Sequence, residues 1–142
     1  MNRGINVALG TDGAASNNRL DLFSEMRIAS LLAKVATLDA AALPAATALK
    51  MATLAGAVAL GLDREVGSLT VGKQADIVAV DFSGVDELPM YDPLSHLVHV
   101  AGRENVSDVW IGGERVVERR RIATLDEALV TTRARAWQQR LQ

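Results

Sequence analysis

The pattern of apolar and polar positions predicts a strand followed by a helix at the start of the chain. Residues 5–9 form a short apolar run, which is typical of a buried strand, and a Gly-Thr-Asp-Gly sequence predicts a turn after it. This strand would deliver Asp12 at its carboxyl end. From residue 20 to residue 35 apolar side chains occupy almost every face, so we expect a mostly buried helix with Asn18 and Asp21 as a capping pair.

A second helical stretch follows, and the pattern then changes to that of strands. Pro44 suits the first turn of a helical stretch that runs to Gly61, and Thr53 is placed to cap a second short helix within it. From Gly67 onward, glycines separate short β-rich pieces such as residues 77–80. This change predicts that a new subdomain begins near Gly67.

The C-terminal part of the sequence predicts a hairpin and a helix. Residues 109–117 predict a β-hairpin, because their central Gly-Gly pair supplies the positive φ angles of a two-residue turn. Thr124 and Glu127 are spaced as a capping box, in which the threonine oxygen and the glutamate carboxylate bond helix-end amides. We therefore expect a helix from this point to about Arg140.

Composition and charge exclude several classes of function. The 142 residues carry 15 Lys and Arg, 17 Asp and Glu, and 4% aromatic residues, which argues against a nucleic-acid partner. The absence of cysteine excludes disulfides, thiolate metal ligands and a thiol nucleophile, and two histidines cannot form a three-histidine metal site. No stretch reaches the roughly 20 uninterrupted apolar residues of a membrane span, and the first residues lack a secretory-signal pattern. We therefore expect a cytoplasmic protein that has no membrane partner.

Three separated motifs carry a resemblance to a known family. They are residues 10–18 (GTDGAASNN), residues 48–53 with 56–62, and residues 67–78, followed by the returning hairpin at 106–117. Together they resemble the deaminase and chlorohydrolase branch of the amidohydrolase superfamily. Within that branch the greatest similarity is to the C-terminal part of the deaminases that act on 5-methylthioadenosine and S-adenosylhomocysteine.

The resemblance implies an α/β fold that is part of a larger one. The family combines a metal-bearing (β/α)8 barrel with a small β-sandwich, and a full barrel needs at least about 200 residues. We therefore expect a C-terminal fragment: the last barrel strand and following helices in residues 1–66, part of the β-sandwich in residues 67–123, and a terminal helix in residues 124–142. The other metal ligands of the family, mainly histidines, and its acid/base group would lie upstream of Met1, so we expect the isolated chain to be inactive.

The resemblance assigns the chemistry to Asp12. This residue matches the family's aspartate that binds the catalytic divalent metal, usually zinc and sometimes iron, and that handles protons for the metal-bound water. A metal lowers the pKa of its water toward about 7, and a neighbouring carboxylate can take the proton. Taken alone, Asp12 also fits an ordinary turn residue. Ser16, on the same loop, is the candidate substrate contact, with polar capping of the next helix as its alternative.

The function implied by the resemblance is hydrolytic deamination of an adenosine-type purine nucleoside. A triazine, guanine or cytosine substrate is the alternative within the superfamily. A non-catalytic, self-associating unit is the alternative from another class, because an orphan parallel strand leaves an open edge. We expect a homo-oligomer or association with the missing barrel half, since removal of seven barrel strands would uncover a large apolar face.

The remaining charged candidates within helical stretches are interpreted as structural. His96 and His99 are three residues apart and could share a metal on a helix, but they fall outside the recurrent residues of the family's motif. Glu25 and Arg27 lie within an otherwise apolar helix, which predicts an ion pair or a hydrogen-bonded network, because an unpaired buried charge is too costly.

Two further features of the C-terminal half are also given structural interpretations. Residues 119–121, three consecutive arginines, predict a solvated connection to a short strand, at a place where the family more often has glycine. Trp110 and Trp137 are predicted to be core or interface anchors rather than surfaces that stack on a substrate.

Overall fold

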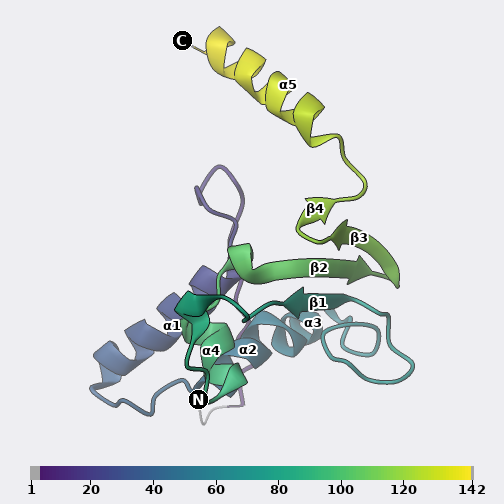
Figure 1. The fold of residues 1–142 in the computed structure, drawn as a ribbon. Helices are drawn as coiled ribbons and strands as arrows, with labels where there is room; N and C mark the ends of the chain where they lie inside the picture. The colour runs from purple at the N-terminus through teal and green to yellow at the C-terminus, as the bar shows by residue number, and fades with distance from the viewer. Residues whose placement is uncertain (1–3, 142) are drawn as a thin grey trace.

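The computed structural model describes residues 4–141 as a group of helices beside a small antiparallel sheet, with one helix leading away from both (Figure 1). The α-helices are α1 (Leu22–Thr37), α2 (Ala45–Ala52), α3 (Leu54–Leu60), α4 (Pro93–His99) and α5 (Glu127–Arg140). The strands are β1 (Ile77–Val80), β2 (Val106–Ile111), β3 (Glu114–Glu118) and β4 (Arg121–Ile122), and two 3-10 helices are η1 (Val85–Glu87) and η2 (Arg103–Asn105). Among residues 4–141, no helix combines the length and apolar character that a membrane span requires.

The N-terminal segment, residues 5–9, is not a strand, which corrects the prediction of a barrel strand in this chain. The Leu9 N–H donates to the Met51 carbonyl oxygen at 2.9 Å, and Asn6 Nδ2 donates to the Ala55 carbonyl oxygen at 2.9 Å. The segment is therefore tied to α2 and α3. A strand requires a neighbour to complete its ladder, and the strands found in the described part of the chain pair only with one another in the C-terminal sheet.

Helix α1 forms where it was predicted, but its cap differs. Asp21 is the N-cap, and its carboxylate accepts hydrogen bonds from the backbone N–H groups of Phe23 and Ser24 at 3.1 and 3.4 Å. The predicted pairing of Asn18 with Asp21 is therefore wrong, because Asp21 itself occupies the cap and lies one residue before the first helical residue.

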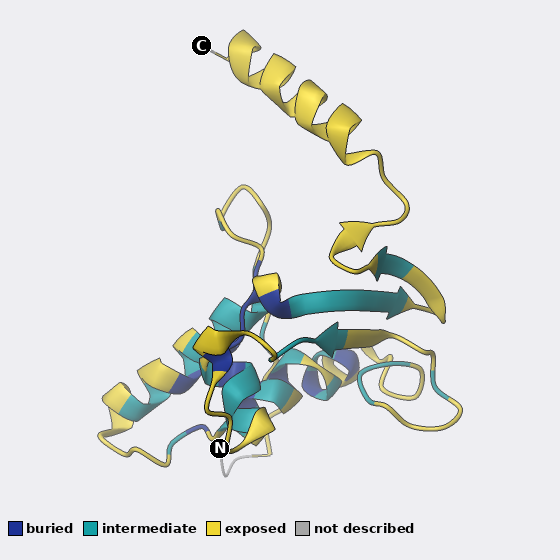
Figure 2. Ribbon diagram, in the orientation of Figure 1, coloured by how far each residue is buried: buried dark blue, intermediate teal, exposed yellow. Residues whose placement is uncertain are grey.

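The prediction that α1 is mostly buried is also wrong for this chain. Only Met26 and Ser30 of the helix are buried (Figure 2). Four large apolar side chains on its outer side are 50–71% exposed, namely Ile28, Leu31, Leu32 and Val35. The all-round apolar pattern therefore exceeds what the described residues cover, and it leaves an uncovered apolar face of the kind the sequence predicted.

The core joins three helices that are distant in sequence. Met26 of α1, Ala48 of α2 and Val98 of α4 form its buried centre, and Leu9 and Phe23 are among the partly buried side chains packed on it. Alanine at position 48 is fully buried and lets the helix backbones approach closely. This core therefore fixes the N-terminal segment and the start of α1 in one unit.

The boundaries of α2 and α3 follow the prediction closely. Pro44 is the N-cap of α2, and α3 ends at Gly61, which adopts a left-handed conformation with φ of 71°. Thr53 lies between the two helices as predicted, but its hydroxyl donates to the Leu49 carbonyl oxygen at 2.7 Å rather than capping α3. Gly67 then passes so close to α3 that a Cβ on it would lie 2.8 Å from the Cβ of Ala57.

The sheet has the strand order β1-β2-β3-β4, and all neighbouring strands are antiparallel. The predicted strand at residues 77–80 and the predicted hairpin are both confirmed. Gly112 and Gly113 form the hairpin turn with φ angles of 58° and 86°, which is the pattern of a type I′ turn. Trp110 is half-buried on β2, beneath the Arg115 guanidinium at 5.4 Å from its ring centroid.

Helix α5 leads away from the sheet, and none of its residues is buried (Figures 1 and 2). Its N-cap is Asp126, whose carboxylate accepts from the Leu129 N–H at 3.0 Å, so the predicted cap at Thr124 is wrong by two residues. The Glu127 carboxylate instead accepts from the backbone N–H of Ile122. Trp137 is 61% exposed and is therefore not a core residue of this chain.

Candidate active site

Asp12 lies in the turn between the N-terminal segment and α1, as the sequence predicted for the end of its first apolar run. The Asp12 side chain is exposed, and its Oδ1 accepts a hydrogen bond from the Gly13 N–H at 2.7 Å. The backbone φ of Asp12 is 59°, a left-handed conformation that non-glycine residues rarely adopt. The Thr11 hydroxyl donates to the Asp12 carbonyl oxygen at 3.0 Å. The carboxylate is thus held at an unusual but locally bonded position.

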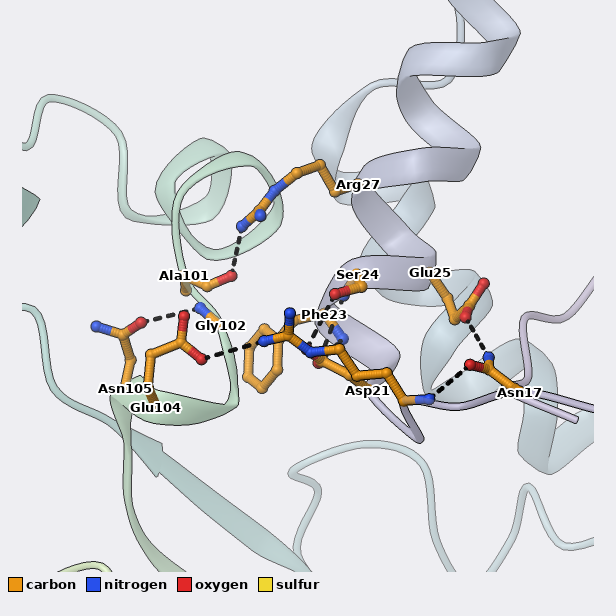
Figure 3. Close-up of polar contacts among 11 residues, drawn as sticks. Asn17, Asp21, Phe23, Ser24, Glu25, Arg27, Ala101, Gly102, Glu104 and Asn105 are labelled. Carbon is orange, nitrogen blue, oxygen red and sulfur yellow. Dashed lines mark hydrogen bonds and ion pairs between the residues drawn. The ribbon is translucent and has the colours of Figure 1, made fainter. Parts of the chain in front are cut away.

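Asn17 connects this turn to α1 (Figure 3). Its Nδ2 donates to the Thr11 carbonyl oxygen and to Glu25 Oε1, both at 2.9 Å. Its Oδ1 accepts from the Arg19 backbone N–H at 2.9 Å. Sequence reasoning treated Asn17 only as a polar capping residue, and its position eight residues before Glu25, a polar residue within an apolar helix, was the signal that could have suggested this contact.

Ser16 is exposed on the same turn, four residues after Asp12. Its backbone N–H donates to the Gly13 carbonyl oxygen at 3.0 Å. Capping of α1, the alternative interpretation of Ser16 and Asn18, is contradicted because Asp21 is the cap. The structure therefore brings Ser16 and Asp12 together on one turn without giving Ser16 a capping role.

The described residues do not by themselves supply a metal site. Zinc in proteins takes three or four protein ligands, and residues 4–141 contain no group of three or more His, Asp or Glu side chains that could hold a metal ion. Asp12 offers one exposed carboxylate. Any metal at Asp12 therefore needs ligands other than the residues described.

His96 is occupied by contacts within the fold. Its Nε2 lies 2.7 Å from the Glu87 carbonyl oxygen, and its ring meets the Phe82 ring edge-on at 5.6 Å. Glu87 is itself buried, and Asn105 Nδ2 donates to Glu87 Oε1 at 2.6 Å. The structural interpretation of His96 is therefore supported.

His99 faces a different group of residues. Its pKa lies below the ordinary value, first because burial disfavours the charged form and then because of the positive charges of Lys34 and Arg27. Among the residues from Gly4 to Leu141, His96 and His99 do not belong to any metal-binding cluster.

The predicted hydrogen-bonded network around Glu25 and Arg27 is present, although the two side chains use different partners (Figure 3). Glu25 accepts from Asn17, as described above. Arg27 Nη2 donates to the Ala101 carbonyl oxygen at 2.6 Å, which links α1 to the segment after α4. Both residues thus serve the arrangement of the helices.

The three consecutive arginines form the turn between β3 and β4. Arg119 and Arg120 have φ angles of 46° and 67°, which explains why glycine would suit this turn. Arg120 also lies 3.8 Å from Asp81. The pKa of Asp81 is lowered mainly by hydrogen bonds from Ser83, and the positive charge of Arg120 adds a smaller effect.

The family assignment rests on the sequence as a whole. The model of the Amidohydrolase family matches residues 1–116. The chain belongs to the amidohydrolase family. This result confirms the resemblance found in the three motifs.

Relatives of this amidohydrolase carry a common name. The chain is 46% identical over 139 residues to the 5-methylthioadenosine/S-adenosylhomocysteine deaminase of Teredinibacter turnerae, covering 98% of this chain and 31% of that protein. It is 50% identical over 135 residues to the protein of the same name from Syntrophobacter fumaroxidans, covering 95% and 31%. The chain thus spans about a third of the length of these relatives.

Solved structures agree with these matches. An adenosine deaminase from Xanthomonas campestris with bound zinc superposes with a TM-score of 0.91 at 50% identity, over 96% of this chain and 31% of that one. The atrazine chlorohydrolase of Arthrobacter aurescens TC1, complexed with zinc, superposes with a TM-score of 0.86 at 32% identity, over 94% and 30%. The amidohydrolase chain therefore shares its local fold with zinc-bound members of the family.

Proposed function

We propose that this chain is the C-terminal part of a metal-dependent amidohydrolase that hydrolytically deaminates an adenosine-type substrate of the 5-methylthioadenosine and S-adenosylhomocysteine class. The observation that carries this proposal is the difference in identity between two groups of relatives. Proteins named for that activity, and a zinc-bound adenosine deaminase, are 46–50% identical over nearly the whole chain. The atrazine chlorohydrolase is 32% identical, so triazines, and likewise guanine or cytosine, are the alternative substrates.

Asp12 supplies one carboxylate to the metal site in this proposal. The other ligands belong to the length of the relatives that these 142 residues do not span. A bound zinc ion lowers the pKa of its water to about 7. The Gly13 N–H holds one Asp12 oxygen, so the carboxylate presents a fixed acceptor, and the Ser16 hydroxyl on the same turn is the proposed substrate contact.

The proposal also includes the organisation of the chain. Residues 1–66 belong to the barrel, residues 67–123 to the small β domain and residues 124–142 to the terminal helix. The change from helices to an antiparallel sheet after Gly67 supports the first boundary, and the exposed course of α5 supports the second. Because one carboxylate does not hold a metal, the 142-residue chain is expected to contain far less than one metal per chain by elemental analysis and to be inactive.

Ammonia release by the protein at the full length of its relatives tests the function. We expect release from 5-methylthioadenosine, S-adenosylhomocysteine or adenosine, and loss of that release in Asp12→Asn. Asp63→Asn, which changes an exposed carboxylate outside the turn, is the matched control and keeps the activity. Release from triazines, guanine or cytosine alone, or none from any purine nucleoside, overturns the proposed substrate class.

A non-catalytic, self-associating unit is the second candidate. The exposed apolar side chains on α1 favour it, because a patch of this kind is usually covered by another surface. Size-exclusion chromatography with light scattering on the 142-residue chain is the test, and a well-behaved monomer counts against this candidate.

A further inference from the structure

The turn that carries Asp12 has one side-chain connection to α1 among the contacts described above. Within the turn, the N–H groups of Ser16 and Asn17 both donate to the Gly13 carbonyl oxygen at 3.0 Å. The Asn17 side chain reaches outward from this turn to Glu25 (Figure 3). It also bonds the carbonyl of Thr11, the residue directly before Asp12.

This connection acts where the backbone is under strain. Asp12 has a φ of 59°, and such a conformation persists only where surrounding bonds hold it. A bond to the preceding carbonyl restricts the peptide plane between Thr11 and Asp12, and thereby the direction of the Asp12 side chain. A bond to the first part of α1 anchors that restriction to a packed element, since Met26 beside Glu25 is a core residue.

We propose that Asn17 is a positioning residue for Asp12, which fixes the Asp12 turn to α1 through simultaneous hydrogen bonds to Thr11 and Glu25. The role rests on the proposed function of Asp12. Asparagine suits it because its amide nitrogen has two donors and its oxygen is a separate acceptor, and all three capacities are used here. Aspartate has no such donors, and it would also place a negative charge against Glu25.

Three variants of the 142-residue chain separate the steps of this proposal. Asn17→Asp removes both donors, Glu25→Ala removes only the bond to the helix, and Asn18→Asp makes the same chemical change at the exposed neighbour outside the network. The measurement is amide hydrogen exchange of Gly13 and Ser16, whose N–H groups donate within the turn. Exchange of the α1 amides and the melting temperature report on the rest of the fold.

We expect Asn17→Asp to accelerate exchange of the turn amides by at least about ten-fold, Glu25→Ala by a smaller factor, and Asn18→Asp by less than about two-fold. The α1 amides are expected to keep their protection in all three variants. Unchanged exchange of the turn in Asn17→Asp overturns the proposal. If Asn17→Asp unfolds the chain, Glu25→Ala decides, and equal exchange in Glu25→Ala and Asn18→Asp overturns it.

The same variants in the full-length protein connect the turn to the reaction. A positioning role predicts that Asn17→Asp lowers kcat by about ten-fold or more while KM changes by less than about two-fold, because the substrate contacts stay in place. A rise in KM with unchanged kcat contradicts positioning of Asp12. The two proposals fail separately: an active Asp12→Asn overturns the proposed function, whereas an unaffected turn in Asn17→Asp overturns only the role of Asn17.

Discussion

The Asp108 carboxylate on β2 is bonded to the backbone of Arg119, eleven residues later, in the turn that follows β3. The Arg119 N–H donates to Asp108 Oδ1 at 3.1 Å, and Arg115 Nε donates to the same oxygen at 3.1 Å. These contacts lower the pKa of Asp108 to about 2, with the backbone bond from Arg119 as the largest cause. One carboxylate therefore holds the two turns of the sheet in register.

This relationship predicts how the stability of the sheet depends on pH. The pKa of Asp108 is about 2 in the folded state, below the ordinary 3.8, so its contribution is present above pH 4 and is lost as the pH falls toward 2. We expect Asp108→Asn to melt at a lower temperature than the parent chain at pH 7, and the difference to shrink between about pH 4 and pH 2. Thermal melting followed by circular dichroism measures this. Glu114→Gln, a change of an exposed carboxylate beside the hairpin turn, is the control, and a difference independent of pH contradicts the prediction.

The same turn predicts a stabilising substitution. Arg119 has a φ of 46°, and a left-handed conformation costs a non-glycine residue about 1–2 kcal/mol, whereas glycine loses about 0.5–1 kcal/mol through chain entropy. Arg119→Gly is therefore expected to raise the free energy of unfolding by about 0.5 kcal/mol, and Arg119→Val, a β-branched residue, to lower it by about 1 kcal/mol. Urea denaturation gives both values. Arg121→Gly, one step into β4, is the control and is expected to destabilise, so stabilisation by both glycines would refute the explanation.

Local signals in the sequence predicted the parts of the fold that depend on neighbouring residues. The hairpin was correct because the Gly-Gly pair alone determines its turn, and Gly61 ends α3 for a similar local reason. The caps of α1 and α5 were misplaced because several capping residues stand close together. In both helices an aspartate directly before the first helical residue is the cap.

The parts that depend on distant residues were not predictable in the same way. Residues 5–9 have the composition of a strand, yet a strand forms only when another lies beside it, and in residues 4–141 this segment is bonded to helices instead. The candidate site shows the same division. The turn position of Asp12 followed from the sequence, whereas the contact between Asn17 and Glu25 depends on how the turn folds back along α1.

A buried hydroxyl on α1 predicts a sharp loss of stability. Ser30 is fully buried, and its Oγ donates to the Leu43 carbonyl oxygen at 2.9 Å, at a residue whose φ is 46°. Ser30→Ala leaves that carbonyl without its partner and is expected to lower the free energy of unfolding by about 1–2 kcal/mol. Thr37→Ala is the control, because the Thr37 hydroxyl is exposed and bonds its own helix, so we expect a change of less than about 0.5 kcal/mol. Equal effects of the two substitutions in urea denaturation would contradict the assigned role of Ser30.

Arg27 predicts that a lost donor matters more than a lost charge. Its Nη2 donates to the carbonyl oxygen of Ala101, a residue that is fully buried, so Arg27→Ala strands an acceptor that water does not reach. We expect Arg27→Ala to lower the free energy of unfolding by about 1–3 kcal/mol, and Arg27→Lys, which keeps a donor on a long side chain, to cost less. Arg27→Met separates the two contributions, because it keeps most of the packing but removes the donor. A loss in Arg27→Met close to that in Arg27→Ala supports the hydrogen bond as the cause, whereas a loss close to that in Arg27→Lys assigns the effect to packing.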